Sequence, residues 1–140
     1  MSGEGYEYFD VAADVGVHAW AETLAGCFRQ CALGVFDLIV PTQAVAPRET
    51  REVAARGGGV EALLVNWLNE CLYVHDLEGF VIHDLEPPQV TGAFIHGILH
   101  GEPVDPARHP RGTLVKAATF HGLEVTESAG RVSARVILDI

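Results

Sequence analysis

The sequence predicts an α+β fold in which two helices pack on one face of a mainly antiparallel β-sheet. Apolar residues recur at helical spacing in two stretches, 24–39 and 60–75. From residue 79 onward, short runs of β-branched and apolar residues are separated by turns and a proline-rich loop, as is typical of a meander of strands. The resulting order, β-α-β-α-β-β-β-β, favours helices packed in a layer on a sheet.

The first part of the chain contains a predicted strand followed by a helix. Residues 6–20 are aromatic and β-branched with Gly16 interrupting, which indicates a strand with a bulge or a close approach at that glycine. Thr23 is a suitable N-cap for the helix, because its hydroxyl can accept a hydrogen bond from a free backbone amide. The helix is expected to end near Ile39, since Pro41 cannot continue it.

A second strand and a second helix follow. Residues 44–55 form a predicted exposed strand, which Pro47 places at a sheet edge or at the beginning of the strand. The glycine run within 56–59 predicts a turn, and no phosphate-binding pattern such as Gly-Lys-Ser/Thr follows it. An amphipathic helix from about Val60 to His75 comes next.

Four strands are predicted in the remaining part of the chain. The proline-rich segment 101–111 is a loop between the second and third of them, and 128–130 is a hairpin turn between the last two. The four predicted strands are 79–85, 89–100, 112–127 and 131–140. No internal repeat stands out, and a chain of 140 residues is expected to form a single domain over 1–140.

The chain is acidic, with 9 Lys and Arg against 19 Asp and Glu and a net charge of −10. A protein that grips RNA or DNA directly presents a basic stripe. This sequence has no Lys/Arg cluster, so tight, direct nucleic-acid binding is not expected. An acidic surface suits solubility, a cation or a basic protein partner.

The sequence also predicts the cellular compartment of the protein. The three cysteines lack the spacing of a disulfide framework, which favours a reducing compartment. The first residues lack the basic and apolar parts of a secretory signal, and no apolar run approaches the ~20 residues that span a bilayer. We therefore expect a cytoplasmic protein without a membrane partner.

Acidic groups near the two ends of the sequence are candidates for a cation site. Asp14 lies near the start, and the sequence stops on an apolar, strand-like run, 137–140, which holds Asp139. If these segments meet, two side-chain carboxylates and the main-chain carboxylate of Ile140 converge, and such oxygen donors suit Ca²⁺ or Mg²⁺ rather than Zn²⁺. On spacing alone, the alternative is that both acids are simply solvated.

Lys116 is the only lysine, and it stands inside an apolar run rather than in a polar segment. Two interpretations remain open: a side chain that snorkels from a sheet edge, or a cation near the carboxylates that contacts a phosphate or a partner protein. Strict alternation puts Lys116 and His121 on opposite faces of a strand. They share a site only if a bulge intervenes or the site lies at the end of the strand.

Other potential ligands and nucleophiles favour structural roles. Cys27 and Cys31 have the spacing of a metal pair, but the second pair that zinc needs is absent, and free cysteines usually pack in cores. His96 and His100 are predicted on a strand, where they lie roughly 13 Å apart and too far to chelate one ion. The sequence has no Gly-x-Ser-x-Gly motif, which argues against a serine hydrolase.

Several stretches together resemble the archease family, and the resemblance covers nearly the whole chain. Each stretch is short, but their order and spacing are specific. The matching stretches are 6–8, 13–16, 23–24, 32–38, 45–53, 63–64, 75–80, 101–103, 115–121 and 138–140. One position departs, because the family usually reads His-Thr-Ala-Asp before a Val/Ile-Gly pair and this sequence reads Val11-Ala12-Ala13-Asp14.

The resemblance implies an accessory protein of RNA processing. Similar proteins help an RtcB-type, GTP-dependent tRNA-splicing ligase to become guanylylated and to turn over, and some are linked to a tRNA methyltransferase as chaperone-like modulators. Carried over, the divalent-metal site, for Ca²⁺ or for Mg²⁺ or Mn²⁺, falls on Asp14, Asp139 and the main-chain carboxylate of Ile140. Lys116 matches the functional lysine of the family.

The expected function is therefore activation of a partner RNA ligase, with no catalysis by this chain itself. The rival hypothesis, from another class, is a stand-alone metal-dependent hydrolase that uses the same carboxylates. For that chemistry the sequence offers no general base beside the acids except His121.

Overall fold

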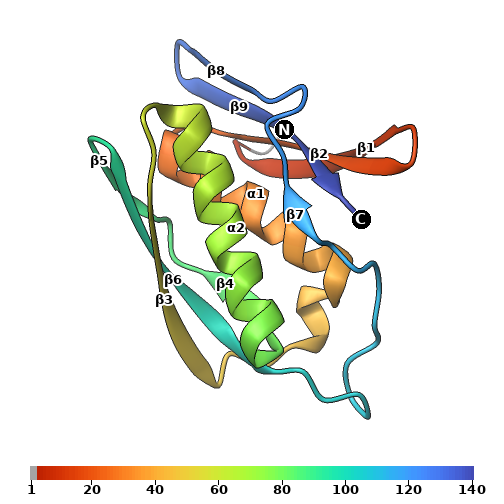
Figure 1. The fold of residues 1–140 in the computed structure, drawn as a ribbon. Helices are drawn as coiled ribbons and strands as arrows, with labels where there is room; N and C mark the ends of the chain where they lie inside the picture. The colour runs from red at the N-terminus through yellow and green to blue at the C-terminus, as the bar shows by residue number, and fades with distance from the viewer. Residues whose placement is uncertain (1–2) are drawn as a thin grey trace.

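The structure is a computed structural model that describes residues 3–140 and consists of two helices and two sheets (Figure 1). The helices are α1 (Leu24–Ile39) and α2 (Val60–Glu78), and a short 3-10 helix, η1 (Thr42–Ala44), lies between them in sequence. The strands are β1 (Gly5–Val11), β2 (Asp14–Ala21), β3 (Glu49–Arg56), β4 (Phe80–Leu85), β5 (Gln89–Thr91), β6 (Phe94–Pro103), β7 (Ala117–Ala118), β8 (Glu124–Ser128) and β9 (Arg131–Asp139).

Sheet A combines strands from both ends of the chain, and sheet B is built from its middle. Sheet A has the order β1-β2-β9-β7, with β8 also paired to β9, and sheet B has the order β3-β6-β4, with β5 paired to β6. Every strand pairing within residues 3–140 is antiparallel. The predicted α+β class with two helices is confirmed, and the strands form two sheets instead of the single sheet expected.

Each helix packs mainly on one of the two sheets (Figure 1). α1 lies on β1, β2 and β9 of sheet A, whereas α2 lies on β3 of sheet B and also touches β7 at the edge of sheet A. The largest fully buried side chains, which include Phe28 and Phe36 of α1 and Trp67 of α2, fill the space between these layers. α1 also touches β4 of sheet B, so both helices lie between the two sheets and contribute apolar side chains to one shared core.

The predicted strand 6–20 is in fact a hairpin, β1–β2. The chain turns at Ala12 and Ala13, where Ala12 has a φ of 48°, an uncommon value for a residue other than glycine. Alanine is not a turn-forming residue, so this turn has no signal in the sequence. The predicted close approach at Gly16 is confirmed, because a Cβ there would lie 2.1 Å from Cζ of Phe9.

α1 has the boundaries that its capping residues predict. Thr23 Oγ1 accepts a hydrogen bond from the Gly26 amide at 3.0 Å, which satisfies an N–H group that has no partner inside the helix. The helix ends at Ile39, two positions before Pro41. Both predicted ends are therefore confirmed.

α2 is longer than predicted. It continues beyond His75 to Glu78 and stops at Gly79. His75 Nδ1 lies 3.0 Å from the Phe80 carbonyl oxygen, so this last turn is tied to the beginning of β4. The apolar pattern alone missed the extension, because the final residues of the helix are mostly polar or exposed.

The later strands are shorter or more divided than predicted. The predicted strand 89–100 is the hairpin β5–β6, and the predicted strand 112–127 contains only β7 and β8, separated by a turn. β6 continues to Pro103 and so takes up the first part of the predicted loop 101–111. The predicted strand 44–55 begins only at Glu49, as β3; Ala44 ends η1, and residues 45–48 lie in no helix or strand.

The expectation that the cysteines pack in the core is confirmed. Cys27, Cys31 and Cys71 are free and fully buried. Burial raises the pKa of the Cys71 thiol far above its usual range. A thiol in this environment stays protonated and inert.

Gly101 allows β6 to approach β4 closely, and this contact gives a first prediction. A Cβ at Gly101 would lie 1.9 Å from the Val81 carbonyl oxygen, which is a backbone atom and cannot rotate away. We expect Gly101→Ala to lower the free energy of unfolding by about 3 kcal/mol, measured by urea denaturation. Gly58→Ala is the matched control, since nothing lies within 4 Å of a Cβ there. Equal stability of the two variants would contradict the close contact.

Candidate functional site

The sheet register brings the two predicted acids together. Asp14 is the first residue of β2 and Asp139 is the last of β9. The antiparallel ladder between these strands ends with Val15 opposite Leu138, so the next position along it places Asp14 opposite Asp139. Opposed residues of a ladder point to the same face of a sheet. The two carboxylates therefore belong to one end and one face of sheet A.

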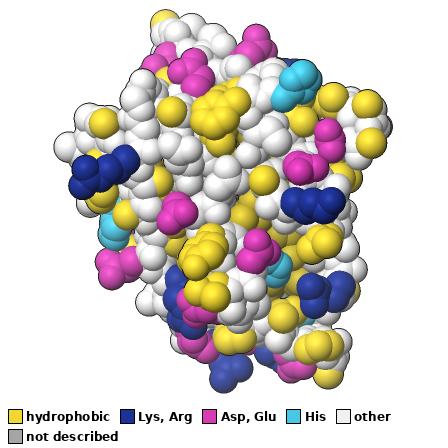
Figure 2. Space-filling model, in the orientation of Figure 1, with side chains coloured by type: hydrophobic (Ala, Val, Ile, Leu, Met, Phe, Trp, Pro, Cys, Tyr) yellow, Lys and Arg dark blue, Asp and Glu magenta, His cyan; other side chains and the backbone are white. Residues whose placement is uncertain are grey.

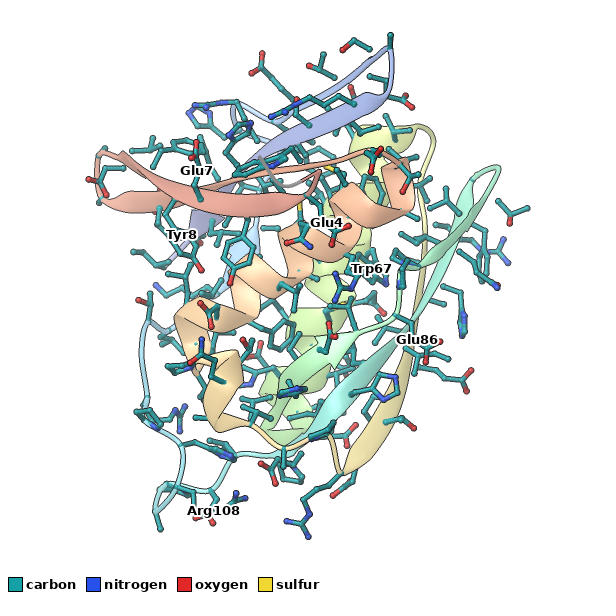
Figure 3. The ribbon with its side chains drawn as sticks, turned by 180° about the vertical axis from the view of Figure 1, so that it is seen from behind. Glu4, Glu7, Tyr8, Trp67, Glu86 and Arg108 are labelled. Atoms are coloured by element: carbon teal, nitrogen blue, oxygen red, sulfur yellow. The ribbon has the colours of Figure 1, made fainter. Side chains whose placement is uncertain are left out.

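Two tyrosines hold the hairpin that carries Asp14 against α1. The Tyr8 hydroxyl donates to the Gly34 carbonyl oxygen at 2.6 Å, and the Tyr6 hydroxyl donates to Asp37 Oδ2 at 3.1 Å. Figure 3 shows Tyr8 between β1 and the helix. Burial, with the Asp37 carboxylate nearby, raises the pKa of Tyr6 to about 12, so this hydroxyl remains a donor at neutral pH.

Lys116 is bound through its backbone to the same aspartate. Its N–H donates to the Asp139 carbonyl oxygen at 2.8 Å, and the next residue, Ala117, is also paired with Asp139. Lys116 therefore lies directly before β7 and beside Asp139. The predicted strand around Lys116 is thus wrong in extent, because β7 begins only at Ala117, but the lysine lies beside the acidic pair.

The side chain of Lys116 is exposed and has no ion-pair or ring partner among residues 3–140. All nine Lys and Arg residues fall within the described range 3–140, and seven of them contact a carboxylate or an aromatic ring. Lys116 and Arg111 have neither kind of partner there. In a chain of net charge −10, an uncompensated ammonium group is available for a ligand or a partner.

The segment that leads to Lys116 is fixed by backbone hydrogen bonds. The amides of Gly112 and Thr113 donate to the carbonyl oxygens of Ile39 and Leu38, at 2.8 and 2.7 Å. These carbonyls belong to the last turn of α1, where they have no partner inside the helix. The segment is thereby anchored to α1 four residues or fewer before Lys116.

Other residues near the acids have distinct positions. Ile140 follows β9 directly and is 37% exposed. Val11, where the resembled family usually has histidine, is directly opposite Asp14 across the hairpin turn. His121 lies in the turn beyond β7, past Thr119, whose N–H donates to the Ile137 carbonyl oxygen. The lysine and His121 therefore lie at different ends of β7.

The donors at this end of sheet A are oxygens. Within residues 3–140, no group of three or more His, Cys, Asp or Glu side chains converges closely enough to hold a metal ion. A cation here would need main-chain oxygens in addition to the side chains of Asp14 and Asp139. Carboxylate and main-chain oxygens are the donors that Ca²⁺ and Mg²⁺ prefer, so the residues present fit a hard cation.

The two histidines of β6 contact different carboxylates. His96 Nε2 lies 3.1 Å from Glu52, and His100 Nε2 lies 2.9 Å from Glu86. Both histidines are on a strand, as predicted, and each contacts its own carboxylate. The two imidazoles are therefore not positioned to bind the same metal ion.

A buried cluster of polar residues surrounds Glu102, and it is the main feature that was not predicted from the sequence. The carboxylate accepts from the Ala46 amide at 2.8 Å and from Arg108 at 2.9 Å, and it contacts His109 Nε2 at 2.9 Å. The Asp105 amide donates to His109 Nδ1, so the proton of the neutral ring is on Nε2 and is donated to Glu102. The only sequence signal was an acid at the end of an apolar strand.

The contacts of Glu102 lower the pKa of its carboxyl group. The Ala46 amide, followed by Arg108 and His109, lowers the pKa of Glu102 from 4.5 to about 2, against the opposing effect of desolvation. Arg108 lies on the loop at the far end of the molecule from β1 (Figure 3). The cluster fixes the start of the loop that continues to Lys116.

This pKa gives a prediction for acid unfolding. A carboxylate with a lowered pKa stabilises the fold above pH 4.5, and its contribution is lost as pH falls toward about 2. We expect Glu102→Gln to cost roughly 2 kcal/mol at pH 7 and less at pH 2.5, measured by urea denaturation across this range. Glu127→Gln, at an exposed position of β8, should leave the pH dependence unchanged. A parallel pH profile for Glu102→Gln and the parent protein would exclude this role.

The fold and the site define a class of small α+β proteins with an acidic pair and a free lysine at one end of a sheet. Residues 6–140 match the model of the Archease protein family, and the chain belongs to this family. Among known proteins, the chain is 36% identical over 138 residues to the archease of Methanopyrus kandleri, covering 96% of this chain and 99% of that protein. It is 34% identical over 139 residues to the archease of Pyrococcus abyssi, covering 96% and 98%.

Two solved structures have the same fold. The solution structure of protein 1598 of Methanobacterium thermoautotrophicum has a TM-score of 0.79 and 35% identity, and the match covers 97% of this chain and 99% of that one. The crystal structure of a Thermotoga maritima archease, described as a possible chaperone, has a TM-score of 0.63 over 96% of each chain. Its 13% identity makes it evidence for the fold alone. No helix within residues 3–140 is long and apolar enough to cross a membrane.

Proposed function

We propose that this archease is a cytoplasmic, metal-binding accessory protein that activates an RtcB-type, GTP-dependent RNA ligase by promoting its guanylylation and turnover, and that it is not itself an enzyme. The observation that carries the proposal is the register of sheet A. It places Asp14 opposite Asp139, while Lys116 bonds to the main chain of the same Asp139. Membership of the archease family supports the proposal.

Asp14, Asp139 and the main-chain carboxylate of Ile140 would hold the divalent cation, Ca²⁺ or else Mg²⁺ or Mn²⁺. Such an ion supplies positive charge, which relieves repulsion when a nucleophile approaches a triphosphate. Lys116 would add a second positive charge beside it. Its backbone is fixed by Asp139, so its side chain would extend from a point beside Asp139 toward a phosphate or a residue of the ligase.

The surface charge suits a protein partner. A ligase that binds RNA presents basic surfaces, and a chain of net charge −10 is attracted to them. On the face that carries α2 and β7, basic side chains are scattered rather than gathered (Figure 2). This distribution supports docking on a basic protein more than direct, tight binding of RNA.

The acidic pair gives a prediction for activation. We expect Asp139→Asn to lower cation affinity about tenfold or more and to abolish stimulation of ligase guanylylation, because one charged donor is lost while the backbone bond to Lys116 is kept. Calorimetry with Ca²⁺ and a guanylylation assay with a purified RtcB-type ligase measure the two effects. Asp76→Asn, at an exposed position of α2, is the control. Stimulation that survives both Asp139→Asn and a short C-terminal tag would refute the cation site.

Lys116 gives a separate prediction. Lys116→Ala should reduce stimulation about tenfold or more and leave cation affinity nearly unchanged, because the side chain is a cation and not a metal ligand. The same two assays separate these effects. Arg111→Ala, which removes the other unpaired cation of this segment, should retain stimulation. Equal losses in the two variants would show that general positive charge, and not Lys116, matters.

A second candidate is a chaperone-like modulator of a tRNA methyltransferase. Membership of the archease family favours it, because some archeases are linked to such an enzyme. Modulation of that kind would be insensitive to Asp14→Asn and Lys116→Ala and sensitive to reversal of surface charge. A stand-alone hydrolase has less support, because His121, its only candidate base, lies beyond β7 from the acids.

A further inference from the structure

β3 is an edge strand of sheet B with part of its backbone unpaired. It pairs only with β6 among the strands of residues 3–140. The Gly57 amide donates to Ala93 across this ladder, whereas the Arg56 carbonyl accepts from Asn66 of α2, away from the ladder. Because hydrogen-bonding directions alternate along a strand, the backbone groups of Thr50, Glu52, Ala54 and Arg56 point away from β6.

Side chains cover the two ends of this edge but not its middle. Arg51 Nη1 donates to the Thr50 carbonyl at 2.8 Å, and Asn66 Nδ2 donates to the Arg56 carbonyl at 2.7 Å. Within residues 3–140, the amides and carbonyls of Glu52 and Ala54 have no hydrogen-bond partner, and both residues are exposed. An unpaired strand edge is a template for another strand.

A groove runs beside this edge, between β3 and α2. It has a volume of about 360 Å³. It is lined by Ala54, Ala55, Arg56, Asn66, Asn69 and Glu70. The alanine side chains leave room for the side chains of an added strand.

We propose that a second copy of this chain pairs with β3, antiparallel and about a two-fold axis at Ala54. The two four-stranded sheets would then form one continuous sheet of eight strands. An antiparallel ladder forms when outward-pointing residues of one copy face those of the other. With Ala54 facing its own copy, Glu52 faces Arg56 of the other copy, and this opposite-charge pair occurs twice.

Charge distinguishes this register from its neighbours. Moving the axis to Glu52 puts two glutamates opposite each other, which is unfavourable in a sheet. Moving it to Val53 places Glu52 opposite Ala54 and leaves the charges unmatched. The sequence of β3 is therefore self-complementary about Ala54.

The proposed interface is separate from the candidate cation site. β3 belongs to sheet B, whereas Asp14 and Asp139 lie in sheet A, on the side of the molecule where the C label stands in Figure 1. A pair of copies would thus carry two open acidic sites. The inference does not depend on the proposed ligase function.

A charge exchange tests the register. Glu52→Arg and Arg56→Glu should each weaken self-association at least tenfold, because each places like charges in contact across the axis twice. The double variant E52R/R56E should restore it, since the opposite pairing is re-created. Sedimentation equilibrium of the full chain, from micromolar to about millimolar concentration, measures the association constant. A monomer throughout this range, or a double variant as weak as the single ones, would overturn the proposal.

A cross-link tests the axis directly. Residues that exchange hydrogen bonds in an antiparallel pair have Cα atoms about 5.5 Å apart, within reach of a disulfide. Ala54→Cys should therefore form a covalent dimer under mild oxidation, and the three native thiols are fully buried. Thr50→Cys is the matched control, because the two copies of that residue would lie roughly 26 Å apart. Cross-linking of Thr50→Cys as fast as Ala54→Cys would exclude this register.

Discussion

The pairing of β9 with β2 is the interaction on which the rest of the structure depends. β9 has β2 on one side and both β7 and β8 on the other. It therefore joins the N-terminal hairpin to the C-terminal strands in one sheet. Its inward side chains, among them Val136 and Leu138, are fully buried, and α1 packs on this layer. The burial that stabilises the sheet is thus the same burial that sets Asp14 opposite Asp139.

The helices could be predicted from the sequence because their signals are local. Thr23 and Pro41 define the ends of α1 through a capping hydroxyl and a missing amide. Asp14, Asp139, Ile140 and Lys116 could be proposed as one site because of the family resemblance. Their placement at one end of sheet A requires a register between distant strands, which no local pattern encodes.

The remaining features depend on contacts that composition does not report. The turn at Ala12 uses an alanine with positive φ, against its usual preference, because the flanking strands pair in register. Lys116 reaches Asp139 because the segment anchored on α1 joins the edge of β9 at this point. Glu102 is buried because four residues surround it, and all four lie on segments that were predicted as loop or exposed strand: Ala46, Arg48, Arg108 and His109.

The position of Asp139 within β9 has a consequence for how the chain tolerates changes in length. Side chains alternate along a strand, so an insertion or deletion of one residue between Val132 and Asp139 would swing the carboxylate to the opposite face, toward α1. The turn between β8 and β9 lies outside this count and can vary freely. Natural variation in length is therefore expected to accumulate in that turn, while the spacing along β9 stays constant.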